Sequence, residues 1–150
     1  MGLIQIREKE ENPQPQWQNE KLKEKSSSRI SETLLKMLVK QRSAELHNMN
    51  LYRWFANICD AKGLHLLCNY YDGRANEEYN HHMWINDFLR SMNMGESADM
   101  FETVQETSEK VTDLVSLFSN TMDAEIKTTN DIFDILEQAR KEGSNFTIKW

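Results

Sequence analysis

The fold is decided by residues 43–82, which read SAELHNMNLYRWFANICDAKGLHLLCNYYDGRANEEYNHH. This stretch contains no proline, and Gly63 separates two segments in which apolar side chains recur at intervals of three, four or seven residues. Such intervals place the apolar side chains on one face of an α-helix. We therefore predict two helices joined by a tight turn at Gly63, and so short a connection makes the two helices antiparallel.

The same periodicity continues on both sides of this stretch and predicts three long helices, over about residues 32–61, 64–93 and 113–142. Helices of that size are about 45 Å long. Residues 96–112, which connect the second helix to the third, follow neither a helical nor a strand period. About seventeen extended residues reach roughly 55 Å, enough to cross the length of a bundle. A crossover of this kind would make the second and third helices parallel.

Particular residues mark the expected helix ends. Ser31 is a suitable N-cap, because its side-chain oxygen can accept a hydrogen bond from the first turn of the following helix, and Thr112 with Asp113 is expected to open the third helix. Gly95 and Gly143 are expected to end the second and third helices. Gly73, inside the second helix, predicts a close helix approach or a local bend. The third helix is expected to bury an apolar stripe formed by Leu114, Phe118, Met122, Ile132, Leu136 and Ala139.

Two terminal segments are expected to differ from these helices. Residues 1–30 contain both prolines and few large apolar side chains, so we predict a flexible extension before a helical domain over residues 31–150. A fourth helix is predicted to start at residue 145, and the sequence stops at Trp150. The expected fold is all-α: an up-down-down-up four-helix bundle with a long crossover between helices two and three, and a fourth helix truncated after residue 144.

Composition excludes several classes of protein. The net charge is −6 and no dense basic block occurs, so nucleic acid is not expected as a partner. Mean hydropathy is −0.73, and no apolar run approaches the roughly 18 residues of a membrane span. The first residues, MGLIQIREKE, lack the apolar core of a secretory signal, and two cysteines make no disulfide framework. We therefore expect a cytoplasmic protein without a membrane partner.

Acidic residues interrupt the expected apolar face of each helix. Glu45 does so on the first helix and Glu125 on the third. Glu78 does so on the second, with His81 one turn later on the same face. Unpaired buried carboxylates are costly, so three that converge need a cation, and carboxylates with one imidazole suit iron or manganese. A lone Glu-x-x-His pair is also common on charged helix surfaces, and that interpretation stays open.

At these residues the chain resembles a known family. Residues 43–82 look like the first two helices of the non-haem bacterial ferritins, and residues 117–136, LFSNTMDAEIKTTNDIFDIL, are similar to their third helix. The matching features are a glutamate seven residues before a tyrosine, a Gly-Leu turn, and an A-x-E-E-x-x-H block from Ala75 to His81. The resemblance covers roughly residues 36–150 and implies a ferritin-like bundle.

The resemblance also implies a ferroxidase centre with two irons. Glu45, Glu78 and His81 would hold the first iron, with Glu78 bridging to the second and Glu125 supporting it. Two irons about 3.5–4 Å apart can jointly reduce dioxygen or peroxide. In the family the fourth helix adds ligands to the second iron, so this half of the centre is expected to be incomplete here.

Three neighbouring residues carry further expectations from the family. Tyr52 matches a tyrosine beside the iron centre, and a core tyrosine with a satisfied hydroxyl is an equally good interpretation. Glu77 matches a ligand of an accessory third iron, or is an ordinary solvated neighbour. Tyr79 stands where bacterioferritins have a haem-ligating methionine, so haem is not expected.

The resemblance implies an iron-storage protein that oxidises Fe(II) with dioxygen or peroxide and keeps ferric mineral in a homo-oligomeric shell, expected to be a 24-mer. An alternative is a ferritin-like structural or interaction protein with a degenerate metal site, which the truncated fourth helix and the N-terminal extension favour. A third is a di-iron enzyme of the rubrerythrin or oxygenase type. That enzyme needs a second Glu-x-x-His, and the third helix has Thr128 three residues after Glu125.

Overall fold

The computed structural model describes residues 30–94 and 110–144 of the chain. These residues form three helices and no strand: α2 (Glu32–Ala61), α3 (His65–Ser91) and α4 (Leu114–Lys141). The all-α prediction is confirmed, and each helix begins and ends within two residues of its predicted bounds. None of the three described helices combines the length and the apolar character needed to cross a membrane. The predicted extension up to residue 29, most of the crossover and the predicted start of a fourth helix lie outside the described residues.

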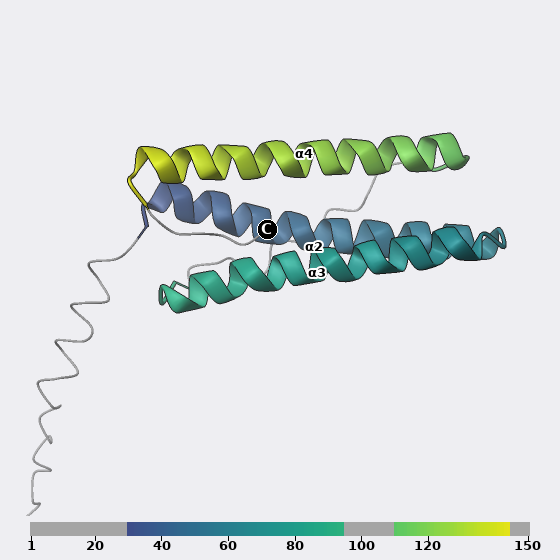
Figure 1. Ribbon diagram of the computed structural model, residues 1–150, viewed down its shortest axis with the longest axis horizontal. Helices are drawn as coiled ribbons and strands as arrows, with labels where there is room; N and C mark the ends of the chain where they lie inside the picture. The colour runs from purple at the N-terminus through teal and green to yellow at the C-terminus, as the bar shows by residue number, and fades with distance from the viewer. Residues whose placement is uncertain (1–29, 95–109, 145–150) are drawn as a thin grey trace, which may run out of the picture.

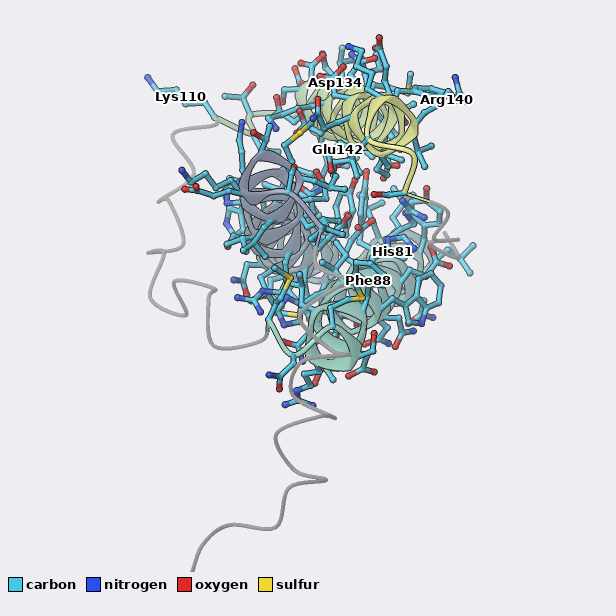
Figure 2. The ribbon with its side chains drawn as sticks, turned by 90° about the vertical axis from the view of Figure 1, so that its left-hand side faces the viewer. His81, Phe88, Lys110, Asp134, Arg140 and Glu142 are labelled. Carbon is cyan, nitrogen blue, oxygen red and sulfur yellow. The ribbon has the colours of Figure 1, made fainter. Side chains whose placement is uncertain are left out.

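The helix α2 packs against both of the others and runs in the opposite direction to them (Figure 1). In that view α2 runs from left to right, whereas α3 and α4 both run from right to left. The helices α3 and α4 are therefore parallel, as a long crossover between them requires. Viewed end on, the three helices occupy the corners of a triangle (Figure 2).

Local hydrogen bonds explain why the helices begin where the sequence predicts. Oγ of Ser31 accepts a hydrogen bond from the backbone N–H of Leu34 at 3.0 Å, at the start of α2. Asp113 and Ser116 form a capping box at the start of α4, in which Asp113 Oδ1 accepts from the Ser116 N–H at 2.8 Å. These bonds satisfy backbone donors that have no partner within the helix.

Two positions after the last residue of each helix the backbone is left-handed, at Gly63 (φ 71), Asn93 (φ 56) and Gly143 (φ 67). In all three cases the N–H of the following residue donates to a carbonyl five residues earlier, which is the Schellman arrangement. Asn93 takes the role predicted for Gly95, because asparagine tolerates this conformation better than most residues. The close approach predicted at Gly73 is wrong: a Cβ there would meet none of the described atoms within 4 Å.

The core consists of two apolar clusters separated by a polar layer. One cluster lies where α2 begins, and Ile30, which the predicted extension included, is buried in it. Its other members include Leu34, Leu38, Ile85, Leu89, Ile135 and Ala139. The second cluster contains Leu51, Tyr52, Phe55, Ala56, Cys59, Tyr71, Ala75 and Leu117. Between them α2 and α3 bury polar side chains, namely Gln41, Arg42, Glu45, Asn48 and Glu78. The bundle therefore places its buried charge near mid-length.

The predicted apolar stripe of α4 is wrong at most of its positions. Of its six residues Ala139 is buried and Ile132 is half-buried, while the other four are exposed. The helix instead buries Leu117, Thr121, Ile135 and Ala139. Three of these lie one residue before a predicted position, which corresponds to a rotation of about 100°. The rotation leaves an apolar face of α4 that no other described helix covers, formed by Val115, Phe118, Met122, Ile126 and Phe133.

Candidate metal centre

Side chains from α2 and α3 converge in the polar layer. Glu45 comes from α2, while Glu78 and His81 lie one turn apart on α3, which Figure 2 shows end on with His81 labelled. One ligand atom of each residue lies within 4.8 Å of those of the other two. The exposed fraction is 0% for Glu45 and 2% for Glu78, and His81 is half-buried. The i, i+3 spacing puts Glu78 and His81 on one face, and we call the three residues the Glu-Glu-His group.

The contacts within the Glu-Glu-His group are short. Nδ1 of His81 lies 3.2 Å from Oε2 of Glu78 and 3.7 Å from Oε2 of Glu45. The other oxygen of Glu45 accepts a hydrogen bond from Nε2 of Gln41 at 2.8 Å. The indole ring of Trp84 lies beside the imidazole, with ring centres 5.2 Å apart. Both carboxylates are thus held with their oxygens toward one imidazole.

The donor set of this group fits a divalent metal ion. Oε2 of Glu45 is buried and has no hydrogen-bond partner among the described residues. A buried carboxylate oxygen without a hydrogen bond is unfavourable, and a metal ion bound by Glu45, Glu78 and His81 would stabilise it. Two carboxylates with one imidazole suit iron or manganese. These three side chains would hold the ion, which would supply Lewis-acid or redox chemistry.

The charges of the group are coupled. Burial by itself raises the pKa of Glu45, but His81, Glu78 and Gln41 favour its anion, and the pKa lies below its ordinary value. Burial and the neighbouring Glu45 hold the pKa of Glu78 above its ordinary value, although His81 opposes this. The two carboxylates raise the pKa of His81 to about 9. Protonated His81 is therefore the cation of the group at neutral pH, and a metal ion would have to replace that proton.

A second polar cluster lies beside the Glu-Glu-His group and is centred on Arg74. Its guanidinium donates to Oε1 of Glu78 at 3.2 Å, and also to Glu77 and Glu125. The guanidinium carbon lies 5.7 Å from the ring centre of Tyr52. Burial by itself lowers the pKa of Arg74, but Glu125 and Glu78 outweigh it and raise the pKa above its ordinary value. A permanent positive charge thus adjoins the candidate metal site.

The other predicted site residues belong to this second cluster. Glu125 accepts hydrogen bonds from Arg74 and from the hydroxyl of Tyr52, and within the described residues it does not join the Glu-Glu-His group. Tyr52 is fully buried, and its burial and its contact with Glu125 raise its pKa. This environment matches a core tyrosine with a satisfied hydroxyl. Glu77 is exposed and bonds to Arg74.

The third helix has no histidine at the position where a second Glu-x-x-His would place one. Thr128 stands there, and its hydroxyl accepts a hydrogen bond from Asn48 Nδ2 at 2.9 Å. His82, next to His81, lies outside the Glu-Glu-His group, with Nδ1 3.0 Å from the carbonyl oxygen of Arg42. The described part of α4 therefore contributes a hydroxyl and a paired carboxylate to the polar layer.

Two residues near the site were not identified from the sequence, although the spacing of each from a site glutamate could have indicated it. Arg74 lies four residues before Glu78, and Gln41 lies four residues before Glu45. Residues four apart on a helix are neighbours on one face. The i, i+4 rule could therefore have identified both, although only the packing of α4 shows that Arg74 also reaches Glu125.

The chain has long helices in up-down-down order, and its buried carboxylates and histidine lie at mid-length. This arrangement is typical of helical bundles that bind metal ions through side chains projecting inward. The family model described as a ferritin-like domain matches residues 35–149, and the chain belongs to this family. Comparisons with curated proteins and with solved structures found no match. Family membership establishes the fold, while the activity has to be argued from the residues of the site.

Proposed function

We propose that the protein binds Fe(II), oxidises it to Fe(III) and stores the ferric product in a shell built from copies of the chain. The observation that carries this proposal is the Glu-Glu-His group, whose ligand atoms lie within 4.8 Å of one another. Membership of the ferritin-like family supports it, because such bundles hold iron through inward carboxylates and histidines. Iron is the substrate and the stored product in this proposal.

In this proposal Glu45, Glu78 and His81 bind Fe(II) through carboxylate oxygens and an imidazole nitrogen. Two negative charges stabilise Fe(III) more than Fe(II), so the site favours oxidation. For every two irons oxidised, dioxygen takes up two electrons and two protons to give hydrogen peroxide, or hydrogen peroxide takes up two electrons and two protons to give two waters. Glu77, exposed beside Glu78, is proposed as a ligand of an accessory iron, and Tyr52 is proposed as the neighbouring tyrosine of the centre.

The activity is tested by adding Fe(II) to metal-free protein without oxygen and then admitting air. Ferric absorbance should develop faster than in buffer, and faster than with the double variant Glu78→Ala, His81→Ala, which should match buffer. A double variant that oxidises iron as fast as the original protein would contradict the proposal.

A matched control changes one glutamate and one histidine away from the site. His65 is exposed at the start of α3, and Glu137 is exposed on α4, where it pairs with Lys141. The double variant His65→Ala, Glu137→Ala should keep the oxidation rate. Helical circular dichroism of both double variants shows whether a lost rate reflects the site or the fold.

The storage part of the proposal needs an assembly. We propose a homo-oligomeric shell of 24 subunits in the cytoplasm, on the strength of the family. Native mass spectrometry of the iron-loaded protein measures the number of chains directly. A monomer that oxidises iron would leave the ferroxidase activity standing and overturn the storage role.

A second candidate function is binding another protein, with the metal site degenerate. The apolar face of α4 favours it, because Val115 is 78% exposed and Phe133 is 64% exposed, and contiguous apolar surface marks contact sites. Protein that binds no iron but forms a stable, defined complex with a host protein would support this function. An iron-loaded shell of identical chains would rule it out.

A further inference from the structure

We propose that the Arg74 guanidinium occupies the place that a second cation would need between Glu78 and Glu125, and so restricts the centre to one divalent cation per chain. The inference rests on the proposed function, since it presumes that the Glu-Glu-His group binds a cation.

The two oxygens of Glu78 face different neighbours. Oε2 lies 3.2 Å from Nδ1 of His81, on the side of the Glu-Glu-His group. Oε1 accepts from the guanidinium of Arg74, also at 3.2 Å. A carboxylate that bridges two metal ions uses one oxygen for each. Here the second oxygen already has a cationic partner, supplied by the same helix one turn earlier.

Glu125, on α4, also has the Arg74 guanidinium as its cationic partner. Its Oε1 accepts from Arg74 and from the Tyr52 hydroxyl, and its negative charge is balanced by the guanidinium. Arg74 therefore joins a carboxylate of α3 to one of α4. A divalent ion held by the same two carboxylates would make the same connection, so the guanidinium and the ion compete for one place.

The competition favours arginine for two reasons. A guanidinium does not lose its proton at any pH at which the protein is folded, so it cannot give way as a neutral group. It is also held in position, because its side chain is only 23% exposed, it bonds to three carboxylates, and it lies against the Tyr52 ring. Two positive charges at the same place repel strongly inside a protein.

The test counts ions with Mn(II), which needs no oxidation to be detected. Equilibrium dialysis against Mn(II) should give one tightly bound ion per chain for the original protein. Arg74→Gln removes the charge but keeps a polar side chain, and it should bind two. Electron paramagnetic resonance should show isolated Mn(II) in the original protein and a spin-coupled pair in the variant.

Three further variants keep the test decisive. Arg53→Gln is the matched control, because Arg53 also joins two helices, α2 to α3 on the surface through Asp72 and Asn76, and the variant should still bind one ion. Arg74→Lys keeps the positive charge and should also bind one. Glu125→Gln should keep the single ion, which shows that Glu125 is not its ligand, even if Arg74→Gln fails to fold.

The outcomes separate this inference from the proposed function. Two ions bound by the original protein would overturn the inference and leave the ferroxidase proposal in place. Loss of the single ion in Glu125→Gln, or one ion in a folded Arg74→Gln, would also overturn it. Original protein that binds no Mn(II) and no Fe(II) would overturn both.

Discussion

The hydroxyl group of Tyr52 on α2 donates a hydrogen bond to Oε1 of Glu125 on α4, although 73 residues separate them in the chain. Further polar contacts attach α4 to the bundle, among them Arg74 to Glu125, and Asn48 to Thr128 and Tyr71 to Thr121, the last two at 2.9 Å each. Much of the apolar surface of α4 faces away from α2 and α3, so these polar contacts add to the packing of Leu117, Ile135 and Ala139 in attaching the helix.

Replacing Tyr52 with phenylalanine should therefore weaken the bundle. Tyr52→Phe removes the hydrogen bond but leaves the ring in place, and Glu125 keeps its contact with Arg74. Because Glu125 is partly exposed, we expect the free energy of unfolding to fall by about 1 kcal/mol, which is less than the roughly 1.5–3 kcal/mol of buried bonds to charged groups. Urea unfolding measures it. Tyr79→Phe, at an exposed tyrosine on α3, should change it by less than about 0.5 kcal/mol. Equal effects of the two variants would contradict the prediction.

The raised pKa of His81 makes stability depend on pH in a stated direction. The pKa is about 9 in the folded chain, against an ordinary value of 6.5, so the folded state holds the proton more tightly. The contribution of protonated His81 to the free energy of unfolding is fully present below about pH 6.5 and is lost as the pH rises to about 9. We expect the metal-free protein to lose on the order of 2 kcal/mol across this window.

Chemical unfolding in the presence of a chelator, at several pH values, measures this loss. His81→Gln should flatten the dependence between about pH 6.5 and 9, because the titrating group is gone. His65→Gln, at an exposed histidine near Asp60, should leave it unchanged. An unaltered slope in His81→Gln would show that another group is responsible.

Metal ions should stabilise the fold through Glu45. Mn(II) at about one hundred times its dissociation constant should raise the free energy of unfolding by about 2.7 kcal/mol. Glu45→Gln keeps the size of the side chain but removes the charge at the buried Oε2, so the gain should disappear. Thermal unfolding with and without Mn(II) measures the gain. Glu137→Gln, on the surface of α4, should retain it, and a gain that survives in Glu45→Gln would place the ion elsewhere.

The rotated face of α4 can be tested with two residues that lie two positions apart. Leu117 is 1% exposed and packs in the second apolar cluster, whereas Val115 is 78% exposed. Leu117→Ala should cost about 2–5 kcal/mol, because it removes buried methyl groups and leaves a cavity. Val115→Ala should cost less than about 0.5 kcal/mol. Urea unfolding of both variants measures the two costs, and the reverse order would contradict the burial of Leu117 and the exposure of Val115.

The helices could be predicted from sequence because their signals are local. Ser31 and Asp113 cap the first turns through bonds that span three residues, and the left-handed turn at Gly63 follows from the backbone freedom of glycine. The end of α3 lies two residues before its predicted position, because asparagine is a weaker signal than glycine and Asn93 precedes Gly95.

The site was predictable in part for the same reason. Glu78 and His81 are neighbours by helical geometry alone, and Glu45 joins them once α2 and α3 pair through a short turn. The partner of Glu125 was not predictable, because it depends on how α4 is rotated and on which long side chain reaches across. Arg74 reaches it from α3, a contact between residues 51 positions apart.

What the sequence by itself determined are the three helices, their order and direction, and the inward position of Glu45, Glu78 and His81. The helices follow from periodicity and capping, which act within a few residues of the chain, and their directions follow from the lengths of the two connections. Only the tertiary structure decided which face α4 buries and that Arg74, rather than an empty space, lies between Glu78 and Glu125. Both depend on packing between distant segments, where burial and the balance of charge in the whole bundle outweigh local preference.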